Sequence, residues 1–416
     1  MYGSLLALIF VLPYSLALIS VCQGTMAVAW VANRILLFKA SSRRGWIQGF
    51  NFTSSSMLWP LMAIGLLIVL TIPFSHAPAL SARKFFTIFL QEIFLMYVVT
   101  QVVHSRKRLY SVLAMLLLTL FLVAIDVMIQ YTWGKSIVHH SLLTLGRVTG
   151  PMNHPNDLGT LLATVLPVVL VSIIACRRWL PLQVMISLLF LFLAIALGLT
   201  DSRGAWFAFT VSMVALGFCF RRRRIIVLII FLLAIFFGIF AMYYMRTRID
   251  PHSSFTNPLG LSSGYDVLKS FFDPSSREAY WGTAIGVIKH YPWFGCGYSA
   301  YVQTLRDLHV GHEEYPHNSL FHITAELGLV GLSLYSWLFV ALCLQGWRII
   351  CQVAGAEDLR ILGCGISCGI LAWMIHSLLD TPWSSVQLGL LVWLLIGILL
   401  SLDLVLSNHK GEKPCL

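Results

Sequence analysis

One stretch of the chain combines groups that are suited to proton transfer. The run Glu313-Glu314-Tyr315-Pro316-His317-Asn318-Ser319 closes a long polar segment and leads into an apolar one. The imidazole of His317 can accept a proton from a hydroxyl group at neutral pH, which is the work of a general base. Histidines recur in the same polar region, so spacing alone leaves His317 as one candidate among five: His252, His290, His309, His312 and His317.

Two arginines stand where apolar helices are predicted to begin. Arg203 lies in Asp201-Ser202-Arg203-Gly204 before an apolar run, and Arg277 lies in the first turn of a helix predicted over residues 276 to 290, after a capping box of Ser275 and Glu278. Guanidinium groups match phosphate oxygens in bidentate geometry, and helix N-termini offer free N–H groups. We interpret Arg203 and Arg277 as ligands for a diphosphate; the alternative for Arg203 is that it reaches the lipid headgroups.

Other polar residues could support such a site. They lie next to predicted helix ends or in outer loops: Arg147, Asn153, Asn156, Tyr315, Asn318 and Asp380. Each also has a plainer interpretation, because every helix start needs a cap, Arg147 has room to be solvated, and Asp380 can simply end a helix. Glu92 and Asp126 fall inside apolar runs, where carboxylates mark transport pathways or buried pairs. We find no nucleotide-binding or metalloprotease motif and predict no metal; Cys364 and Cys368 are interpreted as small packing residues.

The elements that position these groups are membrane helices. The chain has 416 residues, of which 58% are hydrophobic and 11% charged, with a mean hydropathy of +0.83, which is too apolar for a soluble core. The net charge of +11 does not predict nucleic-acid binding, because the cations cluster in short loops between apolar runs. We therefore expect an all-α integral membrane protein.

Apolar runs long enough to cross a bilayer predict about twelve transmembrane helices. They cover residues 3–21, 24–38, 56–73, 84–103, 110–131, 158–175, 181–199, 204–220, 225–244, 318–345, 361–379 and 387–406. Lys and Arg collect in alternate loops, such as 39–44, 106–108, 177–178 and 221–224. This pattern predicts that both termini are cytoplasmic. It also predicts that residues 245–317, between spans 9 and 10, form one large loop outside the cytoplasm. The whole chain, 1–416, is then a single membrane domain.

The order of these motifs resembles the O-antigen ligase and polymerase superfamily of the bacterial inner membrane. The resemblance is carried by Thr200-Asp201-Ser202-Arg203-Gly204, by Ser276-Arg277-Glu278 with Tyr291-Pro292-Trp293-Phe294-Gly295, and by His317-Asn318 before Glu326-Leu327-Gly328-Leu329-Val330-Gly331. Gly150-Pro151-Met152-Asn153-His154-Pro155-Asn156 is similar to a Gly-x-x-x-Asn-Pro-Asn segment of that family, with His154 inserted. The resemblance covers residues 147 to 331.

The resemblance implies a glycosyltransferase that works at the periplasmic face without nucleotide or metal. It implies that Arg203 and Arg277 hold the diphosphate of an undecaprenyl-diphosphate-linked glycan, and that His317 activates the acceptor hydroxyl. A ligase uses lipid A-core as the acceptor, whereas a polymerase uses another glycan repeat; we expect a ligase first. A twelve-span transporter or flippase of a lipid-linked sugar is the alternative from another class, and Glu92 and Asp126 favour it.

Overall fold

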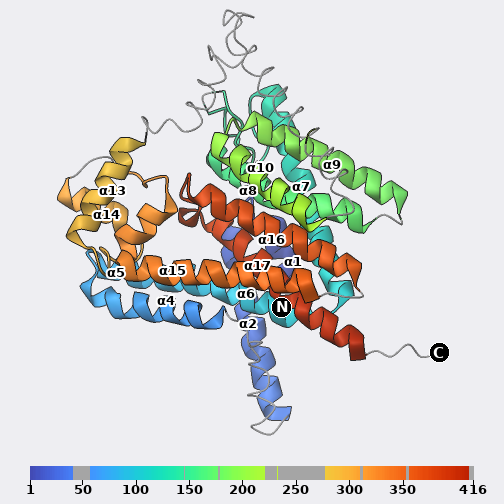
Figure 1. Ribbon diagram of the computed structural model, residues 1–416, viewed down its shortest axis with the longest axis horizontal. Coiled ribbons are helices and arrows are strands. Elements are labelled where there is room, and N and C mark those ends of the chain that lie inside the picture. Colours follow the sequence, from blue (N-terminus) through green and yellow to red (C-terminus); the bar gives the residue numbers. More distant parts are fainter. Residues whose placement is uncertain are drawn as a thin grey trace, which may run out of the picture.

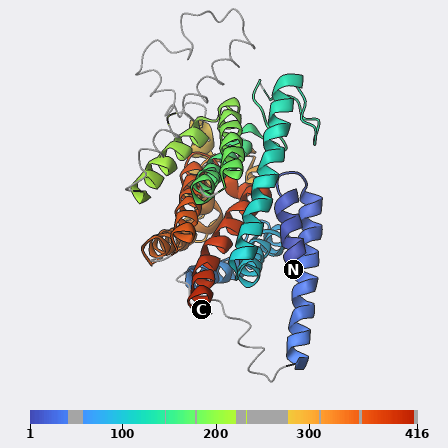
Figure 2. The ribbon, with the colours of Figure 1, turned by 90° about the vertical axis from the view of Figure 1, so that its right-hand side faces the viewer.

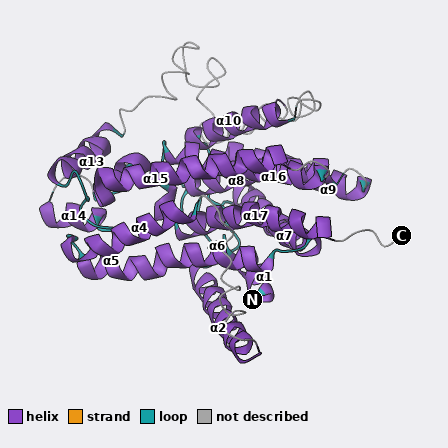
Figure 3. Cartoon of the chain, turned by 60° about the horizontal axis from the view of Figure 1, so that its bottom comes forward, coloured by secondary structure: helices purple, strands orange, loops and turns teal. Residues whose placement is uncertain are grey.

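The computed structural model describes residues 1–40, 57–144, 146–176, 179–220, 232, 277–309, 313–352 and 356–411, and within them it is helical (Figures 1 and 3). The helices are α1 (Tyr2–Val11), α2 (Leu16–Ala40), α4 (Leu58–Thr71), α5 (Pro78–Lys84), α6 (Leu90–Val102), α7 (Arg106–Trp133), α8 (Pro155–Ala175), α9 (Leu180–Leu199), α10 (Arg203–Cys219), α13 (Glu278–His290), α14 (Tyr301–Leu308), α15 (Ser319–Gln352), α16 (Glu357–Ser377) and α17 (Val386–Gly411). Short turns of other helix types complete the set: η1 (Ile72–Phe74), η2 (Phe85–Phe89) and η3 (Pro382–Ser384).

The helices confirm an all-α integral membrane protein. Among the described residues, seven helices are long and apolar enough to cross a membrane, and four more apolar helices are shorter. Exposed tryptophans sit at helix ends, including Trp59, Trp133, Trp179 and Trp347, where aromatic side chains meet the membrane interface. Apart from residue 232, the predicted span 225–244 lies outside the described residues.

The first two predicted spans are wrong in their bounds. The chain breaks at Leu12–Ser15, around Pro13, and not near Cys22, because proline cannot continue the hydrogen-bond ladder of a helix. Tyr2 lies against Arg108 at the start of α7, and the Tyr14 hydroxyl donates to the Thr119 carbonyl in the middle of α7. Helices α1 and α2 therefore form a hairpin whose turn lies beside the middle of α7.

Helices α8 and α16 form the centre of the bundle (Figure 1). The apolar stretch of α8 is 89% buried, compared with 17% for that of α2. Glycines let α16 approach α8 closely: a Cβ at Gly369 would lie 2.3 Å from the Thr164 carbonyl oxygen. Small residues at such positions are typical of helix contacts in membranes.

The described part of the large loop forms a helical cap over the start of α15, with its own apolar core (Figure 1). Helix α13 confirms the helix predicted over 276–290, but the predicted capping box is wrong, because the helix begins at Glu278 and Arg277 is its N-cap residue. Ser275 lies outside the described residues. Figure 1 shows α13 and α14 together at one end of the bundle.

A close crossing of two backbones attaches this cap to α15. The helix is interrupted at Gly328, whose φ is +67° and ψ −170°, and Gly295 opposite also has positive φ. Backbone hydrogen bonds join Cys296 to Ala325 and Leu329 to Pro292. A Cβ on either glycine would lie 2.1 Å from backbone of the other segment, so this crossing requires both glycines.

Candidate active site

Three helix N-termini and the end of α16 meet at one end of the bundle. Thr160, in the first turns of α8, bonds His376 of α16 with 2.8 Å between Oγ1 and Nδ1. Gly204, in the first turn of α10, leaves so little room that a Cβ there would lie 3.2 Å from His376 Nε2. The start of α15 joins the same point, because Ser319 donates to the Asp380 carbonyl. The polar residues that precede α8, α10 and α15 therefore surround the segment that follows α16.

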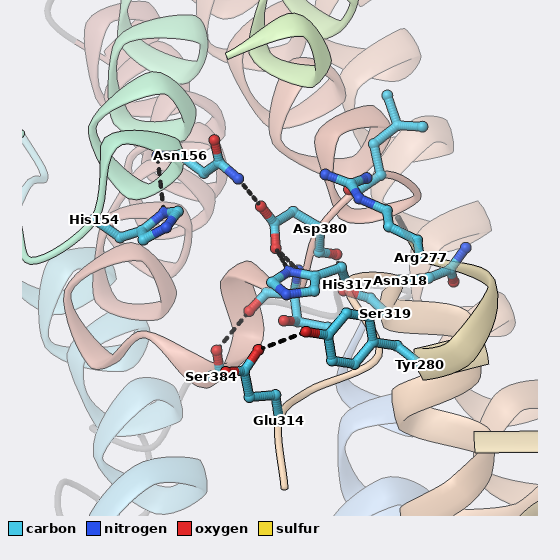
Figure 4. Close-up of polar contacts among 12 residues, drawn as sticks. His154, Asn156, Arg277, Tyr280, Glu314, His317, Asn318, Ser319, Asp380 and Ser384 are labelled. Carbon is cyan, nitrogen blue, oxygen red and sulfur yellow. Dashed lines mark hydrogen bonds and ion pairs between the residues drawn. The ribbon is translucent and has the colours of Figure 1, made fainter. Parts of the chain in front are cut away.

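His317 and Asp380 form a pair at this point (Figure 4). The distance between His317 Nδ1 and Asp380 Oδ1 is 2.9 Å, and their side chains are 30% and 13% exposed. A carboxylate on Nδ1 orients the imidazole and selects the tautomer whose Nε2 lone pair can accept a proton. His317 has a φ of +48°, a left-handed backbone that is uncommon for a residue with a side chain. Strained backbone of this kind concentrates at functional sites.

The environment of Asp380 favours its charged form. Burial alone would raise the pKa of its carboxyl. Larger opposing effects come from the hydrogen bond to His317, the neighbouring imidazoles of His376 and His317, and the backbone N–H of Thr381. The net pKa therefore lies well below the usual range. Asn156 also donates to Asp380 Oδ2 at 2.8 Å. Asp380 is therefore an anion that accepts hydrogen bonds from three elements of the chain.

An aromatic residue covers the imidazole from the cap (Figure 4). The ring of Tyr280, on α13, stands edge to face against His317 with 5.6 Å between centroids. Its hydroxyl donates to Glu314 Oε2 at 3.1 Å, and this bond to the carboxylate raises the pKa of Tyr280. Tyr280 is not among the predicted site residues, and its only signal in the sequence is its place one turn after Arg277.

Arg147 links the outer loop to this pair. Its Nε donates to the Thr200 carbonyl and its Nη2 to Asn156 Oδ1, both at 2.7 Å. Burial and the nearby Arg203 lower the pKa of Arg147, while Asp201 and Asp380 oppose that shift. The alternative that Arg147 is merely solvated is therefore wrong: a chain of contacts runs from Thr200 through Arg147 and Asn156 to Asp380.

Arg277 and Arg203 approach the site from different elements. Arg277 Nη1 donates to the Leu379 carbonyl, directly before Asp380, and Figure 4 shows its guanidinium beside the pair. Arg203 is the first residue of α10 and is exposed. It lies close enough to Arg147 for the repulsion between the two charges to lower the pKa of Arg147. Two cations thus stand at helix starts at this end of the bundle, Arg277 beside Leu379 and Arg203 close to Arg147, and cations at helix starts can hold an anionic group.

Of the remaining predicted site residues, Asn318 caps a helix, and Asn153 and Tyr315 lie apart from the His317–Asp380 pair. Asn318 caps α15 by accepting from Leu320 N at 2.9 Å and donates to the Leu378 carbonyl, so its contacts are those of a helix cap. Asn153 is exposed one turn from Asn156. Tyr315 packs on His322 with 4.9 Å between ring centroids, whereas the ring beside His317 is that of Tyr280. The structure thus brings Asn156 and Asp380 to His317 and leaves Asn153 and Tyr315 aside.

Two histidines that sequence reasoning did not assign complete the surroundings. His154, the insertion in the family segment, caps α8 by accepting from Asn156 N at 3.2 Å, and burial lowers its pKa. His376 is buried one turn before Asp380. The spacing of four residues between His376, at the end of α16, and Asp380, just beyond it, was the signal that could have found it.

Glu92 and Asp126 have partners that explain their burial. Trp393 Nε1 donates to Glu92 Oε2 at 3.0 Å, joining α6 to α17. Asp126 accepts from Ser136 Oγ at 2.8 Å and from Ile137 N at 2.6 Å, joining α7 to the loop that follows it. Both carboxylates therefore hold elements together, and this use removes the main feature that favoured a transporter.

One cavity in the described part of the chain lies away from this site. A cavity of about 780 Å³ lies at the opposite helix ends, between α7, α9 and α16, with Arg106, Tyr110 and Asp358 at one end of its lining. Across the described ranges, no three His, Cys, Asp or Glu side chains converge to hold a metal ion.

The fold and this site define a multi-pass membrane protein with a paired histidine and carboxylate beside helix N-termini that carry arginines. Residues 188–336 match the family described as O-antigen ligase, and this match supports the resemblance to the O-antigen ligase and polymerase superfamily. The matched segment contains Arg203, Arg277 and His317. A search of curated proteins finds no match. The match supports a membrane glycosyltransferase of the ligase or polymerase type at a general level.

Proposed function

We propose that the protein transfers a glycan from undecaprenyl diphosphate to a hydroxyl of lipid A-core at the periplasmic face of the bacterial inner membrane. The observation that carries this proposal is the contact of His317 Nδ1 with Asp380 Oδ1 at 2.9 Å, beside the starts of α8, α10 and α15. In this reading both termini are cytoplasmic, and residues 245–317 face the periplasm.

The reaction needs one base and one anion-binding region. His317 Nε2 takes the proton of the acceptor hydroxyl, the oxygen attacks the anomeric carbon of the donor sugar, and the bond from that carbon to the diphosphate oxygen breaks. The diphosphate leaves with the electron pair, and Arg203 and Arg277 neutralise its charge. Asp380 stabilises the imidazolium that forms. A diphosphate is already a good leaving group, so positioning and charge neutralisation do most of the work.

The test is transfer by purified protein in detergent, where transport has no meaning. Labelled undecaprenyl-diphosphate glycan is offered with lipid A-core or with a second molecule of the donor as acceptor. Product on lipid A-core supports the ligase, and lengthened donor without lipid A-core product supports the polymerase, which is the second candidate within the superfamily. Absence of either product, with donor movement in vesicles, would support the transporter and end the proposal.

A further inference from the structure

The segment after α7 folds back along that helix as a small hairpin, which we call the return hairpin, residues 133–144. Gly134 ends α7 with a φ of +80°, and Lys135 pairs with Leu142. Asp126 then holds the hairpin down by accepting from Ser136 and Ile137. Because Asp126 lies seven residues before the end of α7, the hairpin returns about 10 Å along the helix. Figure 2 shows the chain turning at the end of α7.

This return places the hairpin at the edge of the hydrocarbon core. The basic residues Arg106, Lys107 and Arg108 open α7 at the end that the charge pattern predicts to be cytoplasmic. About twenty residues cross the apolar core, so a span that begins at Leu109 ends near Met128. Asp126, Ser136 and Ile137 therefore lie at the outer boundary, where acyl chains meet headgroups.

The surface of the return hairpin is both apolar and basic. Its large apolar side chains are exposed: Trp133 is 79% exposed, Ile137 52%, Val138 41% and Leu142 63%. Between them Lys135, His139 and His140 are exposed as well. No Asp or Glu occurs from residue 127 to residue 156. An apolar surface that carries a lysine and two imidazole groups that can donate hydrogen bonds, with no carboxylate among them, is complementary to an anionic lipid.

The hairpin is also tied to the candidate active site. Thr144 and Arg147 exchange both backbone hydrogen bonds, and Gln130 of α7 accepts from the N–H groups of Thr149 and Gly150. Arg147 in turn contacts Asn156. A lipid that holds the hairpin would therefore hold the base of the loop that carries Arg147.

We propose that the return hairpin is a binding site for an anionic phospholipid of the outer leaflet. Ile137, Val138 and Leu142 lie against the acyl chains, and Lys135, His139 and His140 donate to the headgroup. The site is separate from the pair at His317, and its test does not require glycan transfer.

The test uses the full chain with a photoreactive benzoylphenylalanine at Val138, reconstituted in vesicles that contain phosphatidylglycerol and phosphatidylcholine. We expect lipid adducts at this position, enriched in phosphatidylglycerol over the vesicle composition. The same group at Lys289, an exposed position on α13, should give few lipid adducts. Lys135→Gln should reduce the enrichment by about fivefold, the effect of one cation near an anionic surface, without reducing total adducts.

Three outcomes would overturn the proposal. Adducts at position 138 no more abundant than at position 289 would show that the hairpin does not meet lipid. Equal labelling of the two lipids by the unchanged protein would reduce the hairpin to an apolar anchor. Full displacement of the phosphatidylglycerol adducts by soluble glycerol phosphate would show a phosphate site that does not need acyl chains.

Discussion

His317 is the residue on which the proposed chemistry depends. Its Nδ1 is occupied by Asp380, so the other ring nitrogen is the proton acceptor. We expect His317→Ala to lower single-turnover transfer by about 10²- to 10⁴-fold, the contribution of a positioned general base. Donor binding should be largely kept, because Arg203 and Arg277 hold the diphosphate in the proposed reaction. His309→Ala, an exposed histidine at the end of α14, is the matched control and should be mild.

The comparison of transfer with donor binding decides the role of His317. If His317→Ala weakens donor binding as much as it slows transfer, His317 is a diphosphate ligand or a structural cap. The base would then have to be sought among the neighbouring carboxylates, of which Glu314 contacts Tyr280 and Asp380 contacts His317.

Asp380 should make the stability of the protein sensitive to acid. Its pKa is lower in the folded protein than in the unfolded chain, so it stabilises the fold above the unfolded pKa of about 4, and this contribution is lost as the pH falls towards the folded pKa. Asp380→Asn should therefore flatten the fall of the thermal midpoint below about pH 4. It should also slow transfer at neutral pH, because the asparagine cannot stabilise an imidazolium. An acid dependence equal to that of the unchanged protein would argue against an ionised Asp380.

The two arginines are expected to bind phosphate through two parallel N–H groups of each guanidinium. Arg203→Lys and Arg277→Lys keep the charge but lose the bidentate geometry, so each should lose most of the transfer activity. Arg277 has a second reason to be sensitive, since it also donates to the Leu379 carbonyl before Asp380. Transfer assays at matched expression, with donor binding measured on the same preparations, test this. Near-normal transfer by both lysine variants would leave the arginines as signals of membrane orientation.

At the scale of elements, the crossing of the cap and α15 is the structural support of the site. Gly328 has a backbone conformation that is essentially restricted to glycine, and Gly328→Ala would also place its Cβ 2.1 Å from Trp293 backbone. We expect a loss of roughly 1–3 kcal/mol from the backbone alone, seen as a lower thermal midpoint in detergent, with transfer reduced because the break lies between His317 and the rest of α15.

A second glycine provides the control for this prediction. Gly282 lies in α13, and a Cβ there would meet nothing within 4 Å. Gly282→Ala should therefore leave transfer unchanged and stabilise the protein by up to about 1 kcal/mol, because alanine favours the helix. Equal thermal midpoints for the two variants would show that the crossing at Gly328 is not tightly built.

At the scale of the whole molecule, the orientation in the membrane decides whether the site can meet its substrates. Reporter fusions at Arg108, Arg178 and Arg223 should report the cytoplasm, and fusions near Pro258 and Arg306 should report the periplasm, as the distribution of Lys and Arg predicts. A cytoplasmic result for the 245–317 loop would place His317 in the wrong compartment and contradict the proposed reaction.

The hairpin of α1 and α2 gives a second topological prediction. Because Tyr14 contacts Thr119 in the middle of α7, a cysteine at Ser15, in a chain whose native cysteines are replaced, should resist an impermeant thiol reagent added from the periplasm. Two full crossings would expose the connection instead. Either arrangement leaves residue 1 and residue 40 on the same side, so the predicted orientation of later helices is unchanged.

The sequence by itself determined the class of fold and the candidates for chemistry. Twenty-residue apolar runs define membrane helices because the bilayer core has a fixed thickness, and this physical constraint is local in sequence. The helix over 278–290 and the starts of α8, α10 and α15 could be predicted for the same reason, since caps and periodicity are local signals. The first two spans failed because an apolar run does not show whether it crosses the bilayer or turns back within it.

Only the tertiary structure decided which polar residues meet. Asp380 is 63 residues from His317, and Asn156 is 224 residues from Asp380, so no local pattern could pair them. The packing of α16 against α8 and α10 brings them to one point. The partners of Glu92 and Asp126 were likewise decided by the tertiary structure. A buried carboxylate needs hydrogen-bond donors, but which donors it meets depends on how the helices pack.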